Sequence, residues 1–418
     1  MKRERLPQTG CAWEELESRM HAFARNDVDW RHGRNAFHVW YGGDDLFDVQ
    51  RRAYTMFMQE NGGGAGKTFP SLKIMEDAVI DYGAELLRGD DATGHITSGG
   101  SESIFVALKA ARDWARKHLR GIREPELVVP YSAHPTFNRA GQYLGIRIVR
   151  VPVGEDFRAD VDAMERAISP ATIGLVGSAV CFPYGVIDPI AELGALAQAR
   201  GLWLHVDACV SGYSAPFGRA LGYDTPEFDF SVPGVASISA DLHKYGFCAK
   251  GTSTILYRNF SLAAYQPFSF ADWPLGRFEN PNVASTRPGG SIAAAWAVMN
   301  YLGRAGYLRL NERLLRLRDR YIEDIGAIDG LAVNGRPHSL IVSWRVTEPE
   351  RIDAEAIVGF MRQKGWFLGP MVDPPGMLIG LSVPHEAARE DLLADLAWAT
   401  DEARQGRRPS ADALQSAY

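Results

Sequence analysis

Short runs of β-branched residues alternate with longer stretches of helical spacing through the middle of the chain. The apolar runs predict strands at 127–131, 147–153, 173–179, 202–207, 236–239 and 252–257, and helices at 102–118, 159–168 and 189–199. Several of these strands are apolar on both faces, as a sheet buried between two helix layers requires. The pattern therefore predicts an α/β fold, with a mostly parallel sheet covered by helices.

The pattern changes near residue 292. A long amphipathic helix is followed by an apolar segment at 331–346, a helix at 354–364 and a strand at 377–383. We expect a smaller C-terminal α+β domain over 306–418, a large domain over 71–305, and an N-terminal segment over 1–70 that forms an arm against another part of the molecule.

Composition favours a small-molecule substrate. The chain has 418 residues, is 46% hydrophobic and carries a formal net charge of only −6, which gives no electrostatic reason to expect nucleic acid as a partner. The basic start does not lead into an apolar run, and the longest apolar stretches are too short to span a bilayer. The four cysteines lie far apart without metal-ligand spacing, so we expect a cytoplasmic protein without a structural metal.

Two strand ends carry groups that suggest chemistry. Asp207 ends the apolar segment Leu204–Ala208, where burial is costly unless a cation meets it, although a strand-end Asp can also cap a turn. Lys244 follows the next strand and falls at the same sheet edge, although such a lysine taken alone is commonly solvated. Desolvation and the neighbours His243 and Lys250 predict a lowered pKa for Lys244, which favours a reactive amine.

Two weaker signals fall on the same edge. Ser98, Gly99 and Gly100 stand before a predicted helix and can form an anion site, although the segment can also be a plain N-cap with Ser101 or Ser103 as the capping residue. His134 follows another strand, where an imidazole can stack on an aromatic ring or serve only as a loop histidine.

Several longer motifs carry a family resemblance. The segments TSGGSESI, SAHPTFNRA, FPYGVIDP, HVDACVSGY and SISADLHKYGFCAKGTS occur in this order between Tyr41 and Trp296. They resemble the sphingosine-1-phosphate lyase branch of the group II decarboxylases, enzymes that depend on pyridoxal 5'-phosphate and have the aspartate-aminotransferase (type I) fold.

The resemblance implies a role for each matching residue. Lys244 is expected to carry pyridoxal phosphate as a Schiff base, Asp207 to bind the ring nitrogen, and His134 to stack on the ring. The residues expected to hold the cofactor phosphate are Ser98, Gly99, Gly100 and His243. Lys250 and Tyr41 are expected near the substrate, and the segment 285–291, with Gly290 and Ser291, is expected to reach the phosphate of a neighbouring subunit, which implies a homodimer.

The implied reaction is retro-aldol cleavage of a β-hydroxy amine, such as a long-chain base phosphate, to an aldehyde and an amine such as phosphoethanolamine. Lys244, Lys250 and Tyr41 are all candidates for the proton transfers. An amino-acid α-decarboxylase is the alternative, and it needs a cation such as Arg287 or Lys67 for the substrate carboxylate. A cofactor-binding protein without turnover is a third possibility. The stretch 61–68 lacks a histidine that the family usually has there, which leaves open whether the substrate is phosphorylated.

Overall fold

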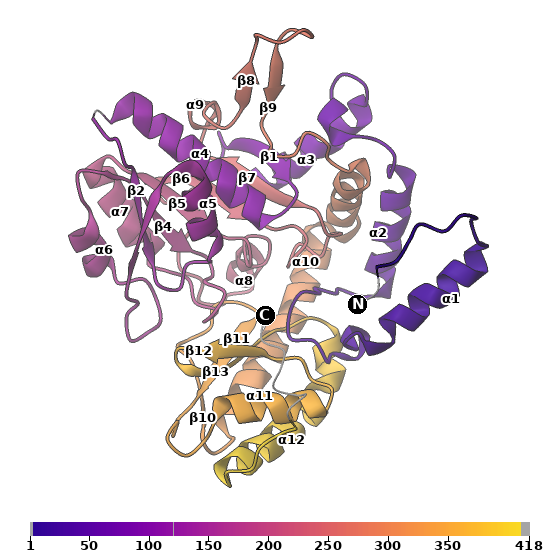
Figure 1. The fold of residues 1–418 in the computed structure, drawn as a ribbon. Helices are drawn as coiled ribbons and strands as arrows, with labels where there is room; N and C mark the ends of the chain where they lie inside the picture. Colours follow the sequence, from indigo (N-terminus) through magenta and orange to yellow (C-terminus); the bar gives the residue numbers. More distant parts are fainter. Residues whose placement is uncertain (1–2, 120, 411–418) are drawn as a thin grey trace.

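A seven-stranded mixed sheet forms the centre of the molecule. The computed structural model describes residues 3–119 and 121–410. The sheet order is β1-β7-β6-β5-β4-β2-β3, and β7 alone runs against the other strands (Figure 1). Its strands are β1 (Thr93–Thr97), β2 (Glu126–Pro130), β3 (Arg147–Val151), β4 (Thr172–Ser178), β5 (Trp203–Asp207), β6 (Val235–Ala240) and β7 (Ser253–Tyr257). The predicted mostly parallel sheet is confirmed.

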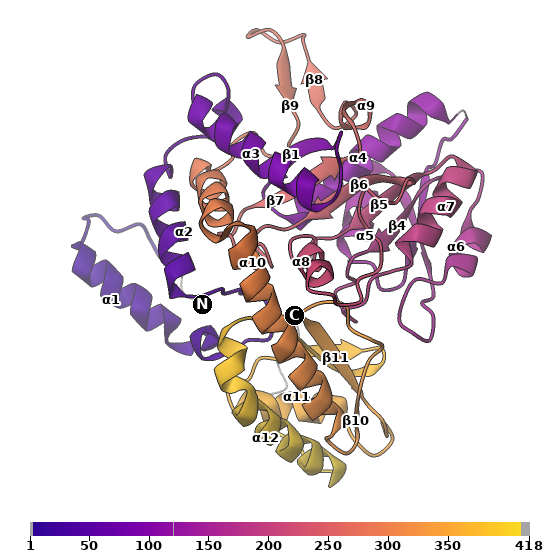
Figure 2. The same cartoon turned by 180° about the vertical axis from the view of Figure 1, so that it is seen from behind.

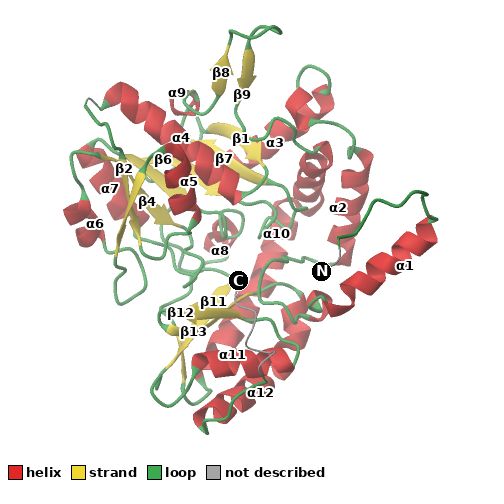
Figure 3. Cartoon of the chain, in the orientation of Figure 1, coloured by secondary structure: helices red, strands yellow, loops and turns green. Residues whose placement is uncertain are grey.

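Helices cover the sheet on both faces (Figure 3). Along β2, Leu127 and Val129 join the apolar cluster of α4 (Gly100–His118) and α5 (Thr136–Leu144), whereas Val128 joins the cluster with α6 (Val161–Ala167) and α7 (Ile190–Arg200). This alternation places apolar side chains on both faces of one strand, as the sequence pattern predicts. The remaining helices of this part are α3 (Pro70–Leu86), α8 (Ala215–Ala220) and the short α9 (Phe260–Ala263).

The C-terminal part is a four-stranded antiparallel sheet with two helices. The strand order is β10-β11-β13-β12, formed by β10 (Leu331–Val333), β11 (Ile341–Val346), β13 (Pro375–Gly380) and β12 (Gly369–Val372). The helices are α11 (Ala354–Gln363) and α12 (Pro384–Arg404). The predicted α+β character of this part is confirmed, and α12 is an addition to the predicted elements.

One long helix joins the two sheets. Helix α10 (Gly289–Gly326) runs from the region beside α3 to the C-terminal sheet, with a non-helical residue at Gly303 (φ 52°, ψ −177°) (Figure 2). This break lies close to the boundary predicted between residues 305 and 306, which stays a prediction.

The N-terminal region has its own helices. Helix α1 (Trp13–Phe23) buries no residue, whereas α2 (Asp44–Met56) packs along α10. Between them, the Ala36 N–H donates to Phe367 O at 2.8 Å, so this segment also contacts the C-terminal part. A hairpin of β8 (Phe268–Phe270) and β9 (Phe278–Asn280) projects from the end of the molecule that lies opposite the C-terminal sheet (Figure 1). Across the described residues, no helix is long and apolar enough to cross a membrane.

Candidate active site

A cavity of about 360 Å³ lies at the carboxyl ends of the parallel strands. The register places Ser178, Asp207 and Ser239 side by side at the ends of β4, β5 and β6. The turn before α4 and the turn between β2 and α5 complete the walls. Ligands in sheets of this kind bind at this edge. The cavity brings together the predicted residues Ser98, Gly99, Gly100, His134, Asp207, His243 and Lys244.

Lys244 forms an ion pair with the carboxylate of Asp241, a residue that the sequence does not predict for the site. Its Nζ lies 3.0 Å from Oδ2 of Asp241, which is buried. Burial by itself lowers the pKa of Lys244, but the carboxylates of Asp241 and Asp207 outweigh it and raise the pKa above the usual value. The predicted lowering of this pKa is therefore wrong, because the carboxylates are closer and stronger neighbours than the cations considered from the sequence.

Asp207 is fixed by hydrogen bonds at the bottom of the cavity. Its Oδ1 accepts from the Cys209 N–H at 3.1 Å and from Ser239 Oγ at 3.4 Å. Ser239 Oγ also lies 3.3 Å from Nε2 of His205, whose pKa burial lowers to about 4, so this imidazole is neutral. Among the described residues, no cation forms an ion pair with Asp207. A buried carboxylate of this kind fits a cationic group of a ligand, such as a protonated ring nitrogen.

The turn before α4 forms a cradle in which side chains would not fit. A Cβ on Gly100 would lie 2.6 Å from Cys209 Sγ and 2.9 Å from the Asp241 carboxylate oxygens. His243 borders the same turn, since a Cβ on Gly99 would lie 3.3 Å from its Cε1. Two buried polar atoms here, His243 Nδ1 and Asp241 Oδ1, have no hydrogen-bond partner in the described part of the chain. The free N–H groups at the N-terminus of the 19-residue helix α4 and the unpaired Nδ1 of His243 can bind a phosphate group, whereas the Asp241 carboxylate faces the amine of Lys244.

His134 presents a neutral ring to the cavity. Its Nδ1 accepts from the Thr136 N–H at 3.2 Å and lies 2.9 Å from Thr136 Oγ1. Burial lowers the pKa of His134, and Lys244 lowers it further against the opposing charge of Asp207. A neutral imidazole held in one orientation suits the stacking role that the family resemblance implies.

Lys250 lies next to this site and forms no ion pair with a carboxylate of residues 3–119 or 121–410. Its Nζ lies 4.5 Å from the ring centroid of Trp40 and donates to His243 O at 3.4 Å. Lys244 Nζ lies 5.9 Å from the same ring. Desolvation and the charge of Lys244 lower the pKa of Lys250 to about 8. The two lysines therefore share a neighbourhood but differ in their electrostatic surroundings.

Besides Lys250, three predicted residues lie outside the lining of this cavity. The Tyr41 hydroxyl donates to Asp44 Oδ1 and accepts from Arg31 Nη1 at 3.3 Å. Gly290 and Ser291 lie in the first turn of α10, where Ser291 Oγ donates to Lys250 O at 3.3 Å. The single chain therefore does not bring these residues to Lys244, and their roles stay predictions.

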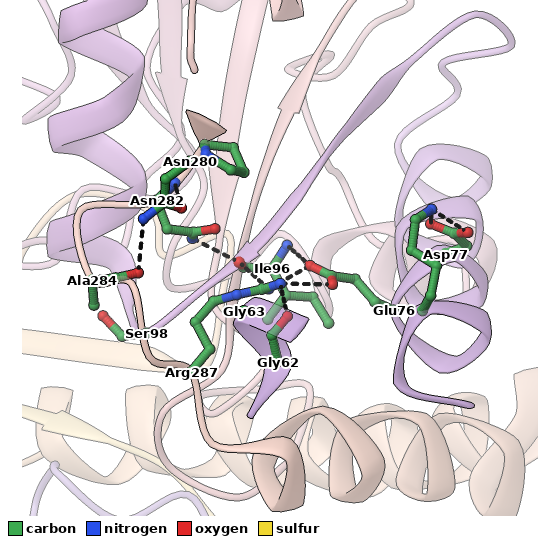
Figure 4. A network of polar contacts seen from close by, with 12 residues as sticks. Gly62, Gly63, Glu76, Asp77, Ile96, Ser98, Asn280, Asn282, Ala284 and Arg287 are labelled. Carbon is green, nitrogen blue, oxygen red and sulfur yellow. Dashed lines mark hydrogen bonds and ion pairs between the residues drawn. The ribbon is translucent and has the colours of Figure 1, made fainter. Parts of the chain in front are cut away.

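Arg287 anchors two loops to the sheet instead of facing the cavity (Figure 4). Its guanidinium pairs with both carboxylate oxygens of Glu76 and also donates to Gly62 O at 2.8 Å and Ile96 O at 3.2 Å. Its backbone N–H donates to Asn61 Oδ1 at 3.0 Å. Both terminal nitrogens of the Arg287 guanidinium, Nη1 and Nη2, thus already donate hydrogen bonds within the chain.

Glu102 holds the segment that precedes Arg287 at a second point, residues 283–284. Its carboxylate accepts from the N–H groups of Ser98 at 2.7 Å, Val283 at 2.7 Å and Ala284 at 3.2 Å. It therefore connects the phosphate cradle with the segment that leads to Arg287. Glu102 lies in the first turn of α4, where an acidic residue is favoured by the helix dipole, and this position could have identified the residue. Asp241 and Trp40 have no comparable local signal.

The surroundings of the cavity suit an organic cofactor. Among the described residues, no group of three or more His, Cys, Asp or Glu side chains could hold a metal ion. The amine of Lys244, the carboxylate of Asp207, the ring of His134 and the anion cradle fit the four parts of pyridoxal phosphate, namely its aldehyde, ring nitrogen, ring face and phosphate.

Comparisons with known proteins agree with this chemistry. Residues 67–327 match the pyridoxal-dependent decarboxylase conserved domain. The chain is 39% identical over its whole length to a sphingosine-1-phosphate lyase of Arabidopsis thaliana, of which it covers 77%. It is 31% identical to a probable L-aspartate decarboxylase of Pyrococcus furiosus, over 87% of this chain and 94% of that protein.

A solved structure extends the likeness to the fold. The structure of a sphingosine-1-phosphate lyase from Burkholderia pseudomallei has a TM-score of 0.91 and 34% sequence identity, and the match covers 97% of this chain and 94% of that one. The predicted type I fold is confirmed. The chain belongs to the pyridoxal-dependent decarboxylase family and is a lyase that depends on pyridoxal phosphate.

Proposed function

We propose that this lyase cleaves the bond between Cα and Cβ of a phosphorylated β-hydroxy amine of the sphingosine-1-phosphate type. The products are a long-chain aldehyde and phosphoethanolamine. The proposal is supported by the similarity to sphingosine-1-phosphate lyases from a plant and a bacterium. Pyridoxal phosphate, when bound, supplies the electron-accepting ring that makes cleavage of a bond to Cα possible.

The observation that carries the proposal is the contrast between the two lysines. Retro-aldol cleavage needs a base to take the proton from the β-hydroxyl and an acid to give a proton to Cα. Lys244 is held beside Asp241 at 3.0 Å, so its free amine keeps a proton and can act as the acid. Lys250 has a pKa of about 8 and forms no ion pair with a carboxylate of the described residues, so about a tenth of it is neutral at pH 7 and can act as the base.

The site is less suited to amino-acid decarboxylation. A substrate α-carboxylate needs a cation beside the cofactor. Arg287 is already paired with Glu76, and Lys67 is exposed and does not line the cavity. Neither candidate cation is therefore placed to receive that carboxylate.

We further propose that the enzyme works as a homodimer in the cytoplasm. Gly290 and Ser291 lie outside the cavity of their own chain, which supports a role in a neighbouring site. Sedimentation velocity of the cofactor-loaded protein tests the dimer, and cell fractionation tests the location.

Product analysis tests the reaction. Purified enzyme with pyridoxal phosphate is incubated with sphingosine 1-phosphate, and aldehyde and phosphoethanolamine are quantified by mass spectrometry. We expect equal amounts of both, and neither from Lys244→Ala. Release of carbon dioxide from amino acids without aldehyde formation would indicate the decarboxylase instead. If the spectrum of the bound cofactor stayed unchanged with every amine tested, the protein would bind the cofactor without turnover.

A further inference from the structure

A second cavity of about 730 Å³ adjoins the cofactor cavity. The two cavities share His134 and Phe182, so a ligand at the cofactor can extend past these side chains from one into the other. The walls of the second cavity come from the β2–α5 turn, the segment after β4, and the β12–β13 hairpin of the C-terminal sheet. We call this second cavity the interdomain cleft.

The interdomain cleft is lined mainly by apolar side chains. They include Phe182, Pro183, Met371 and Val372, of which Val372 is 91% exposed. Exposed apolar surface of this kind next to an active site favours an apolar ligand.

The polar groups of the cleft do not form an anion site. The Arg150 guanidinium donates to Asn138 Oδ1 at 2.7 Å and 3.0 Å, to Tyr131 O at 2.7 Å and to Ala133 O at 2.8 Å. The Tyr184 hydroxyl donates to Asp373 O at 2.8 Å. The carboxylate of Asp373 adds negative charge to the wall, which disfavours a phosphate there.

We propose that the interdomain cleft binds the alkyl chain of the substrate and thereby selects long-chain β-hydroxy amines over short ones. The inference rests on the proposed function. A chain attached to Cβ passes His134 and Phe182 and lies against Met371 and Val372, while the phosphate end of the substrate stays outside the cleft. The C-terminal sheet then takes part in specificity, although the predicted site residues all lie outside it.

A series of 2-amino-1,3-diol 1-phosphates of increasing chain length tests the proposal. Burial of one methylene group contributes about 0.8 kcal/mol, which corresponds to a roughly fourfold increase in kcat/KM. We therefore expect kcat/KM to rise about tenfold or more for each added pair of methylenes and to level off once the cleft is full. Equal kcat/KM for short and long chains would overturn the inference and leave the proposed function standing. Cleavage of no member of the series would contradict the proposed function itself.

Two variants locate the binding site of the chain. Met371→Asp and Val372→Asp each place a charge in the cleft, and Val372 is exposed enough for its replacement to leave the fold intact. We expect each to lower kcat/KM for the longest substrate by at least about tenfold and to leave the shortest substrate nearly unchanged. Phe260→Asp is the matched control, since Phe260 is 77% exposed and lines neither cavity.

Binding to the cofactor-free protein gives a readout that does not depend on turnover. A fluorescent long-chain alcohol should bind the wild type and Phe260→Asp alike and should bind Met371→Asp and Val372→Asp at least about tenfold more weakly. Unchanged binding in both cleft variants would overturn the inference. A change in sedimentation of both variants would also overturn it, because the cleft would then be an interface between copies of the chain.

Discussion

Lys244 Nζ and Asp241 Oδ2 lie 3.0 Å apart within one turn after β6. Asp241 Oδ2 also lies 3.6 Å from His243 Nε2, and the second oxygen, Oδ1, has no hydrogen-bond partner among the residues that the structure describes. The carboxylate is buried, so its charge is poorly screened and acts strongly on Lys244. Asp241 therefore controls whether the free amine of Lys244 carries a proton.

Replacing Asp241 with Asn should lower the pKa of Lys244. The amide keeps the size of the side chain but removes the charge that raises this pKa. The pKa is measured in the cofactor-free protein from the pH dependence of Lys244 modification by an amine reagent, followed by peptide mapping. Asp188→Asn is the control, because Asp188 is equally buried but accepts from the N–H groups of Ala159 and Ser178 instead. An unchanged Lys244 titration in Asp241→Asn would contradict the role of Asp241.

The activity should rise with pH as Lys250 loses its proton. The pKa of Lys250 is lowered to about 8, so the amine is mostly protonated below this value and mostly neutral above it. A base must be neutral, which gives kcat/KM a rising limb centred near pH 8. Lys250→Met should lose this limb and about 10²-fold to 10⁴-fold of the activity, while the bound cofactor keeps its absorbance.

Lys117→Met is the control for Lys250, since Lys117 is exposed on α4 and lines neither cavity. It should keep the wild-type pH profile. A rising limb near pH 8 that persists in Lys250→Met would assign the base to another group.

Gly100→Ala should weaken cofactor binding. The added Cβ would lie 2.6 Å from Cys209 Sγ and 2.9 Å from the Asp241 oxygens, so the cradle has to shift. Overpacking costs about 1–3 kcal/mol, which corresponds to roughly a tenfold to hundredfold rise in the dissociation constant of pyridoxal phosphate. Gly326→Ala is the control, because apart from its chain neighbours and its own helix backbone no atom of the described residues lies within 4 Å of the added Cβ. Equal dissociation constants in a spectroscopic titration would show that the turn adapts freely.

The sequence predicts the parts of the fold that local patterns specify. The buried strands β2, β4 and β5 are mainly apolar. Asp207 ends β5 and His134 follows β2, and the structure brings both residues into one cavity. The sequence does not predict strand β1, because TGHIT is short and half polar and becomes a strand through pairing with β7.

Contacts between distant segments explain the other differences. Trp40 and Lys250 are in contact although more than two hundred residues separate them in the sequence, and no pattern in the chain indicates that contact. The sign of the Lys244 pKa shift depends on Asp241, whose carboxylate points toward Lys244 in the folded chain. Such orientations are decided by packing, which periodicity does not encode.

Glu76 and Arg287 form a buried ion pair that should contribute strongly to stability. The side chains are 7% and 13% exposed, and the pair holds the glycine loop at Gly62 and the end of β1 at Ile96. Removing one partner leaves a buried charge without its counter-ion, which costs about 3–5 kcal/mol. Glu76→Gln and Arg287→Met should each lower the free energy of unfolding by about this amount in urea titrations, and the double variant should lose less than the sum of the two.

An exposed ion pair on α3, the helix that carries Glu76, provides the comparison for the stability effect. Lys73 and Asp77 are joined at 2.6 Å on α3, but their side chains are 52% and 54% exposed, so solvent screens the pair. Asp77→Asn should therefore change the free energy of unfolding by less than about 1 kcal/mol. If Glu76→Gln proved equally mild, the loops at Gly62 and Arg287 would be held by their backbone hydrogen bonds, such as Gly62 N–H to Arg287 O at 2.7 Å, and not by the ion pair.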